Sequence, residues 1–126
     1  MTIQNPHLLP KVRSPELMRL VGTFPCTLRI ASFIPGRKCS GSDTVVGCHL
    51  PTIGKGVATK VTDLAVVAGC LTCHDIIDGR DIAGRAFLMT NYPAAVQARI
   101  TDALVETHAR LVAAGYEWGK DWEVVG

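Results

Sequence analysis

Residues 70–80 of the chain read CLTCHDIIDGR. Cys70 and Cys73 have the C-x2-C spacing of a metal knuckle, in which two thiolates reach one zinc ion from a tight turn. The stretch also predicts that this turn leads into a short helix. His74 and Asp78 are four residues apart, so on such a helix they project from one face, within reach of one divalent cation. Two kinds of metal ligand are therefore expected here: thiolates at the turn and an imidazole–carboxylate pair on the helix.

A zinc ion held by cysteines alone needs two more thiolates. Cys26 and Cys39 are the candidates, because they flank a predicted strand and turn that lie upstream in the chain. We therefore expect a structural zinc ion bound by Cys26, Cys39, Cys70 and Cys73. Two alternatives stay open. Cys26 and Cys39 are buried free thiols, which is a common state of cysteine, or His74 replaces one cysteine as a zinc ligand.

The pattern Cys70-x-x-Cys73-His74 is also that of covalent haem attachment. Such attachment requires export to an oxidising compartment and a second axial ligand, for which Met89 is a candidate only 15 residues after His74. Residues 1–10 lack the basic and apolar regions of a secretory signal, and no run reaches the roughly 18 apolar residues of a membrane span. We therefore expect a cytoplasmic protein, whose cysteines act as metal ligands or thiols rather than disulfides.

His49 ends a β-branched stretch, residues 44–49, that predicts a strand stopped by Pro51. This position suits a base that must approach a phosphodiester without being buried. Metal-assisted phosphodiester hydrolysis needs a base that deprotonates water, a cation that stabilises the pentacovalent phosphate, and positive groups that position the backbone. Taken singly, His49 is equally explained as a core or surface residue, and Asp78 as a cap or an ion-pair partner. Taken together, the pattern offers His49 as base, His74 and Asp78 as metal ligands, and three basic residues as DNA contacts: Lys55, Lys60 and Arg80.

The charges of the chain are unevenly distributed. The net charge is only +2, but residues 11–60 carry eight basic and two acidic side chains, whereas residues 61–126 carry five basic and nine acidic ones. A basic first half joined to an acidic second half fits one phosphate-facing surface. A solvated surface with uneven charge is the alternative.

Turn residues and short apolar stretches predict an α+β fold for a single small domain. The clearest element is a helix over 93–114, where apolar residues recur at helical spacing and Gly115 supplies the stop. The other predicted elements are a helix opened by Ser14-Pro15-Glu16 and ended by Gly22, strands at 27–30, 44–49 and 64–68, a loop at 52–62, a helix closed by Gly79, and a helical or looped link at 81–90. We expect three parts: an N-terminal arm and short helix at 1–22, a zinc-stapled core at 23–90, and a C-terminal helix and tail at 91–126.

In their order, these motifs resemble the HNH nucleases. In that superfamily a strand histidine is followed by a loop, an Asn/Asp-Leu step, and a C-x-x-C-H that opens a helix with a metal ligand four residues later. The matching positions are His49, Asp63-Leu64, residues 70–74 and Asp78. The chain is more closely similar to the YbcO-like family of small phage and prophage nucleases, through Pro25-Cys26, Arg29-Ile30, Cys39, Thr44-Val45-Val46, His49-Leu50, Gly54-Lys55-Gly56, Lys60-x-x-Asp63 and residues 70–80. The resemblance covers about 55 of the 126 residues.

The resemblance implies a small ββα-metal (His-Me finger, HNH-like) core with a structural zinc site, and a long C-terminal helix packed on it. It implies that His49 is the general base and that His74 and Asp78 hold a catalytic divalent cation: Mg²⁺, Mn²⁺ or Zn²⁺. Many HNH enzymes carry a further acidic or histidine metal ligand directly before the base, where this chain has Cys48. Cys48 points to the opposite face of the strand from His49 and is expected in the core.

Two functions are compatible with these residues. The first is a metal-dependent DNA endonuclease of phage recombination or replication, with DNA and recombination proteins of the phage or its bacterial host as partners. The second is a zinc-stabilised DNA- or protein-binding module whose HNH site is vestigial. If neutral His49 activates the water, nuclease activity should fall below about pH 6.5, the unperturbed histidine value.

Overall fold

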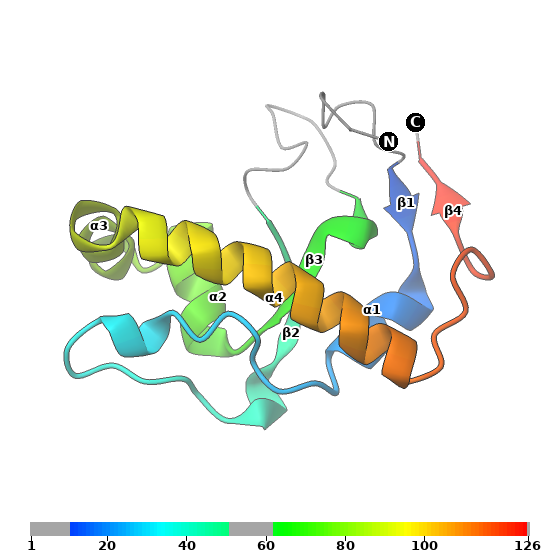
Figure 1. The fold of residues 1–126 in the computed structure, drawn as a ribbon, viewed down its shortest axis with the longest axis horizontal. Helices are drawn as coiled ribbons and strands as arrows, with labels where there is room; N and C mark the ends of the chain where they lie inside the picture. The colour runs from blue at the N-terminus through cyan, green and yellow to red at the C-terminus, as the bar shows by residue number, and fades with distance from the viewer. Residues whose placement is uncertain (1–10, 51–61, 126) are drawn as a thin grey trace.

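The computed structural model describes residues 11–50 and 62–125, and in these ranges it has the α+β composition that the sequence predicts (Figure 1). The described residues form four α-helices and two antiparallel sheets of two strands each. The helices are α1 (Pro15–Val21), α2 (Leu71–Asp78), α3 (Ile82–Asn91) and α4 (Pro93–Ala113), and the strands are β1 (Val12–Arg13), β2 (Val46–His49), β3 (Val66–Gly69) and β4 (Glu123–Val124). Three single turns of 3₁₀ helix complete the fold: η2 (Ala31–Phe33), η3 (Ser42–Thr44) and η4 (Asp63–Ala65).

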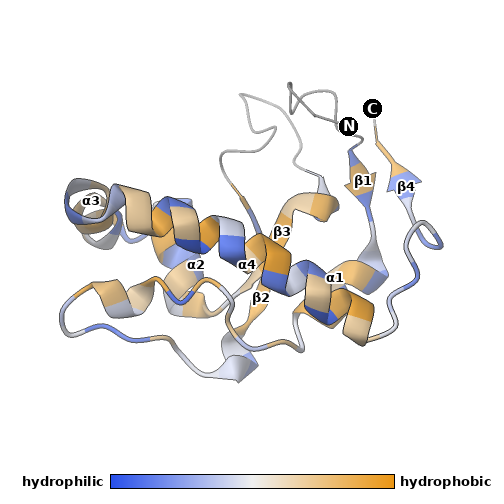
Figure 2. Ribbon diagram, viewed as in Figure 1, coloured by the Kyte–Doolittle hydropathy of each residue, from blue (hydrophilic) through white to orange (hydrophobic). Residues whose placement is uncertain are grey.

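The β2–β3 pair lies at the centre of the molecule, and α2 follows β3 directly. Val46 pairs with Gly69 at one end of the pair, and His49 pairs with Val66 at the other. All four residues of β3 are buried, and Figure 2 shows this strand as hydrophobic along its length. A strand buried on both faces needs covering elements on each side, and α4 covers one of them, crossing β3 in Figure 1.

Helix α4 packs on β3 through one stripe of its surface. Its buried residues recur at intervals of three and four, as one face of a helix requires: Val96, Ile100, Ala103, Thr107 and Leu111. Thr107 is polar, and its hydroxyl is satisfied in the core because the Ala68 backbone N–H donates to it at 3.3 Å. One buried cluster includes Leu17 of α1, Val67 of β3 and Ile100 of α4, so all three predicted parts of the chain contribute to a common core.

The predicted helix ends are confirmed by their caps. The Ser14 hydroxyl accepts the Leu17 N–H at 3.2 Å and caps α1, with Pro15 in the first turn. Helix α2 ends at Gly79, whose φ of +82° is the left-handed conformation that a glycine adopts without strain. Helix α4 begins at Pro93 and is followed by Gly115 at φ +78°.

Residues 27–30, predicted as a strand, do not form one. The Thr27 N–H makes a single bridge to Ala68 O at 2.7 Å. Arg29 then turns the chain with a φ of +48°, and its N–H donates to the Cys26 sulfur at 3.4 Å. The alternation of apolar side chains was misleading because Leu28 and Ile30 are buried from a bend rather than from a strand.

Two further elements were only partly predicted. The link at 81–90 is the regular helix α3, with Asp81 as its N-cap accepting the Gly84 N–H. The tail forms β4, which pairs with β1 so that Val12 lies opposite Val124. Figure 1 shows the two short strands side by side at one end of the molecule.

The predicted loop at 52–62 and the arm at 1–13 fall mostly outside the described residues. Within residues 11–50 and 62–125, every helix is too short or too polar to cross a membrane.

Candidate functional site

Four of the five cysteines come together in the structure. The sulfur atoms of the four-cysteine cluster, Cys26, Cys39, Cys70 and Cys73, all lie within 4.8 Å of one another. The Cys39 sulfur is 3.9 Å from that of Cys26 and 3.7 Å from that of Cys73. Four sulfurs at the 2.3 Å zinc–sulfur bond length stand about 3.8 Å apart in a tetrahedron, and no disulfide links them. The cluster can hold a metal ion such as zinc, and it joins the residues that the sequence predicts as ligands.

Local structure explains how these cysteines meet. Cys70 is the N-cap residue of α2, and Cys73 lies in its first turn. A helix N-terminus favours negative charge, so it favours the thiolate forms that bind metal. The segment after Cys39 docks on this terminus, because the Thr72 N–H donates to the Ser40 hydroxyl at 3.1 Å.

The thiols of the cluster perturb one another. A hydrogen bond from Cys73 lowers the pKa of Cys26 to about 4, while burial and the neighbouring Cys26 raise the pKa of Cys39 to about 11. The same hydrogen bond, together with burial, raises the pKa of Cys73. Without a cation the cluster therefore favours a thiolate beside neutral thiols. A divalent cation supplies the positive charge that the remaining thiols need to ionise.

This convergence also bears on the haem interpretation of residues 70–74. Cys70 and Cys73 are buried and face two other thiols. Thiols that hold haem must instead reach two substituents at the edge of a flat macrocycle, so the arrangement favours a metal knuckle.

Cys48 is separate from the cluster. It is fully buried on β2, as the alternation of the strand predicts. Burial raises the pKa of its thiol to about 12, and the charge of Asp78 contributes to the shift. Cys48 is therefore a core side chain.

His49 is held by a buried carboxylate. Its Nε2 lies 2.9 Å from Oδ1 of Asp63, and the Asp63 side chain is 7% exposed while that of His49 is 37% exposed. The second carboxylate oxygen accepts the Ser14 N–H at 2.8 Å. Asp63 is thus fixed from two sides, and it orients the His49 ring through Nε2.

The second predicted pair also forms. His74 Nε2 and Asp78 Oδ2 are 3.1 Å apart on successive turns of α2, on one face as predicted. Arg80 reaches both, with NH2 3.2 Å from Asp78 Oδ2 and 3.4 Å from His74 Nδ1, and its Nε pairs with Asp75 at 3.1 Å. The pairing of Asp78 with Arg80, one of the alternatives left open by the sequence, is therefore present.

The four-cysteine cluster is the only set of three or more metal-binding side chains with converging ligand atoms in residues 11–50 and 62–125. His74 and Asp78 supply two such atoms. Of the predicted DNA contacts, Arg80 is 59% exposed at the side chain. Lys55 and Lys60 lie outside the described residues.

Three residues near these sites were not predicted as part of them. Asp63 belongs to the Asp-Leu step of the motif, but its bond to the His49 ring has no signal in the sequence. Ser14 is recognisable as a helix cap, yet its N–H also binds a carboxylate 49 residues away. Arg29 carries no signal for its left-handed backbone, a conformation that usually selects glycine.

His108, left out of the site on the sequence, has a structural role. Its Nε2 lies 3.0 Å from Leu64 O, and its ring meets Trp118 edge-on at 5.5 Å. This contact fixes η4, the turn that carries Asp63.

Comparison with protein-family models, with curated proteins and with solved structures found no match to the chain. The resemblance to the YbcO-like family therefore stays a prediction.

Proposed function

We propose that the chain is a metal-dependent HNH-type endonuclease that hydrolyses DNA phosphodiester bonds with His49 as general base. The observation that carries the proposal is the His49–Asp63 pair at one end of the β2–β3 hairpin, with His74 and Asp78 on the helix that follows. This order of two antiparallel strands and a helix is that expected of a ββα-metal core.

In this proposal the protein's own groups handle the proton. Asp63 accepts the Nε2–H of His49 and so fixes the tautomer in which Nδ1 is unprotonated. Nδ1 then takes a proton from water as the oxygen attacks phosphorus. The carboxylate stabilises the imidazolium that results, and the Ser14 N–H holds the carboxylate in place.

His74 and Asp78 are the residues that would hold the catalytic cation, since imidazole and carboxylate suit Mn²⁺, Mg²⁺ and Zn²⁺. When bound, such a cation stabilises the charge that develops on the phosphate. Cys48 offers no third ligand, because it is buried on the far face of β2. Arg80 is placed to contact the phosphate backbone once its carboxylate partners turn to a cation.

The four-cysteine cluster is proposed to hold zinc as a structural element of this core. It fastens the segments around Cys26 and Cys39 to the N-terminus of α2, and so fixes the helix that carries His74. The proposed substrate is DNA, in phage recombination or replication, with the bacterial cytoplasm as the place of action.

Nicking of supercoiled plasmid in Mg²⁺ or Mn²⁺ tests this function. His49→Ala should lower the rate by about 10² to 10⁴, the usual contribution of a general base, without changing the zinc content. Asn91→Ala is the control, because the exposed Asn91 side chain donates to the Phe87 carbonyl within α3, away from both imidazole–carboxylate pairs. Equal activity of the His49 variant and the wild type would contradict the assignment.

One observation favours a second candidate, a non-catalytic zinc-stabilised DNA- or protein-binding module. The zinc ligands are complete, whereas His74 and Asp78 are only two ligands and are paired with Arg80. Such a module would shift labelled DNA in a gel, or bind a protein partner, without cleaving plasmid in Mg²⁺, Mn²⁺ or Zn²⁺. The proposed nuclease would cleave.

A further inference from the structure

Arg29 has a backbone conformation that few residues other than glycine adopt. Its φ is +48°, and among the described residues it is the only non-glycine with positive φ. Glycine reaches this region without strain, whereas a residue with a Cβ does so at a cost and persists there only when its surroundings hold it. The contacts of Arg29 show what holds it.

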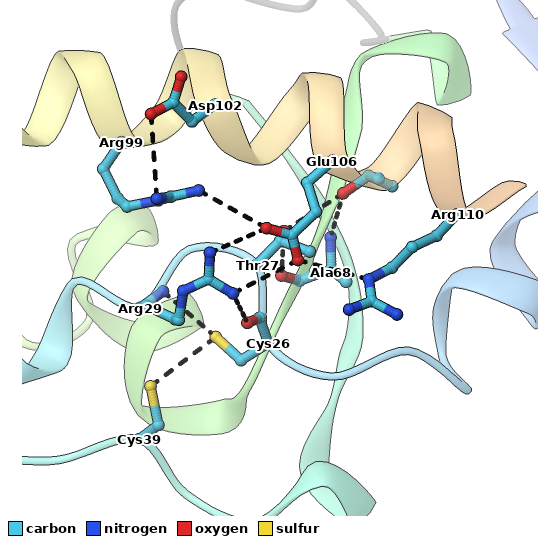
Figure 3. A network of polar contacts seen from close by, with 10 residues as sticks. Cys26, Thr27, Arg29, Cys39, Ala68, Arg99, Asp102, Glu106 and Arg110 are labelled. Atoms are coloured by element: carbon cyan, nitrogen blue, oxygen red, sulfur yellow. Dashed lines mark hydrogen bonds and ion pairs between the residues drawn. The ribbon is translucent and has the colours of Figure 1, made fainter.

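Both the backbone and the side chain of Arg29 bind the Cys26 segment. The N–H donates to the Cys26 sulfur at 3.4 Å, and NH1 donates to the Cys26 carbonyl at 3.2 Å (Figure 3). The direction of the N–H is set by the turn over residues 26–28, and the positive φ of Arg29 sets the direction in which its side chain and the following residues leave that turn. The strained conformation therefore occurs at the residue whose N–H and side chain both bind the Cys26 segment.

The guanidinium also reaches helix α4. NH2 and NH1 of Arg29 donate to the two carboxylate oxygens of Glu106 at 2.8 and 3.3 Å. This fork is the bidentate geometry that gives the strongest arginine–carboxylate pairs. It joins residues 77 apart in the sequence, and Figure 3 shows it spanning from the thiol segment to α4.

Glu106 is itself held by two more arginines of α4. Arg110 Nε lies 3.4 Å and Arg99 NH2 3.8 Å from its carboxylate. The Glu106 side chain is 27% exposed, so the pair is partly shielded from solvent. Three guanidiniums around one carboxylate leave a net positive charge beside the four-cysteine cluster.

We propose that Arg29 and Glu106 form a clasp that positions Cys26 for metal binding and couples occupancy of the four-cysteine cluster to the docking of α4. A zinc ion with four thiolates carries a net charge of about −2, which the Arg29 guanidinium partly offsets. Glu106 fixes that guanidinium, which also binds the Cys26 carbonyl, and so maintains the turn in which the Arg29 N–H reaches the sulfur. By reciprocity, zinc binding stabilises the contact with α4 as much as the contact strengthens zinc binding.

This inference rests on the metal cluster and requires no DNA and no cleavage, so it stands or fails separately from the nuclease proposal. The first test is the zinc affinity of the full chain, measured by competition with a chromophoric chelator at neutral pH. Arg29→Gly keeps the N–H and relieves the backbone strain but removes the guanidinium. Glu106→Gln keeps the size of the partner but removes its charge.

Both variants should bind zinc about 10-fold to 100-fold more weakly than the wild type, which is the usual effect of removing a group that hydrogen-bonds to a metal ligand. Arg29→Lys, which keeps the charge without the fork, should lie between them and the wild type. Arg110→Gln is the matched control, because Arg110 contacts Glu106 but not the cysteine segment, and its affinity should stay within about 2-fold of wild type.

Hydrogen exchange of α4 amides gives a second readout. Removing zinc from the wild type should raise exchange around Glu106, and this response should be reduced in Glu106→Gln. Wild-type affinity in Arg29→Gly, or tighter binding, would show that only the backbone matters and would overturn the clasp. If Arg29→Gly does not fold, unchanged affinity in Glu106→Gln overturns it equally, as does a wild type that binds no zinc.

Discussion

The four-cysteine cluster differs from the two imidazole–carboxylate pairs, His49–Asp63 and His74–Asp78, in how many metal-ligand atoms the chain brings together. We call these two pairs the histidine face. In the cluster, four sulfur atoms lie within 4.8 Å of one another, and Cys39 is 3.9 Å from Cys26 and 3.7 Å from Cys73, close to the separation in a tetrahedral zinc site. On the histidine face, each imidazole is bound to one carboxylate, and Arg80 occupies the position beside Asp78. The cluster supplies from the chain itself the four ligands that a structural zinc ion needs. Neither imidazole–carboxylate pair brings together three ligand atoms within residues 11–50 and 62–125.

The two regions also differ in how the fold holds them. The cluster is supported by hydrogen bonds to its sulfurs and by the N-terminus of α2, so its geometry is tied to the stability of the core. His49 is 37% exposed and depends on one buried carboxylate for its orientation. A change in the cluster should therefore act on folding, and a change on the histidine face should act on chemistry.

The largest effect is expected from loss of a cluster ligand. Cys73→Ser replaces a buried thiolate with a hydroxyl that binds zinc poorly, and the metal's binding free energy is part of the folding free energy. The variant should lose zinc and melt roughly 10 °C or more below the wild type, as measured by circular dichroism and metal analysis.

Cys48→Ala is the control for a cysteine outside the cluster. It should keep its zinc and lose only about 1 kcal/mol of unfolding free energy, the typical effect of a single substitution. Equal melting temperatures for the Cys73 and Cys48 variants would mean that a cluster cysteine contributes no more to stability than a buried cysteine outside the cluster.

A smaller effect, on both activity and stability, is expected from substitution of Asp63. Asp63→Asn keeps the shape of the side chain but removes the charge that stabilises the His49 imidazolium. Plasmid nicking should fall by about 10-fold to 100-fold, as for other outer-shell partners. The unfolding free energy should fall by about 1–3 kcal/mol, because the Ser14 N–H loses a charged acceptor.

If Asp63 positions His49, Asp63→Asn should lose nicking activity and not only unfolding free energy. Zinc content should be unchanged in Asp63→Asn, since the cluster does not contact Asp63. A variant with full activity and reduced stability would make Asp63 a structural residue, and the histidine face would lose its positioning carboxylate.

The pH dependence of stability separates the core thiol from the cluster. Burial raises the pKa of Cys48 from about 9 to about 12. Below about pH 9 the thiol is neutral in both states and its contribution is fully present. As pH rises from 9 toward 12, the unfolded chain ionises first, so stability is lost.

The cluster thiols lose protons when the chain folds around zinc, but this pH dependence is the same in wild type and in Cys48→Ala and cancels in the difference between them. The wild type, about 1 kcal/mol more stable than Cys48→Ala at pH 8, should therefore lose about 1–2 kcal/mol relative to the variant by pH 10.5 and become equally or less stable, as measured by urea denaturation. A difference that stays constant over this range would contradict the raised pKa.

Features of the two regions that depend on residues close together in the sequence were predicted correctly, whereas features that depend on distant residues were missed. The C-x2-C knuckle, the caps of α1 and α2, and the spacing of His74 and Asp78 are local patterns, and the structure forms them where predicted. The bend at Arg29 was missed because alternation of Leu28 and Ile30 suits a strand equally well. Its cause is a contact between the backbone and the sulfur of Cys26.

Contacts between segments far apart in the sequence were also not predicted. The bond from Ser14 to Asp63 spans 49 residues and the fork from Arg29 to Glu106 spans 77. The pairing of β1 with β4 joins segments at opposite ends of the chain through only two residues each. Strands so short carry no periodic signal, and a single polar contact between elements depends on tertiary packing.

The smallest effect is expected where the histidine face is closed by Arg80. The Arg80 side chain is 59% exposed, and exposed ion pairs contribute only about 0–1 kcal/mol. Arg80→Gln should therefore barely change the melting temperature. It frees Asp78 and His74 from a competing cation, so Mn²⁺ should bind the zinc-loaded protein about 2-fold to 5-fold more tightly, as measured by titration calorimetry.

Arg85→Gln is the matched control, because Arg85 lies nearby and donates to Ile77 O without touching the His74–Asp78 pair. An equal gain in both variants would mean that only the overall charge matters. Unchanged or weaker Mn²⁺ binding in Arg80→Gln would mean that the pair is a surface ion pair and not a cation site. In that case the difference between the two regions would no longer be one of complete and incomplete metal sites, because only the cysteine cluster would bind a metal.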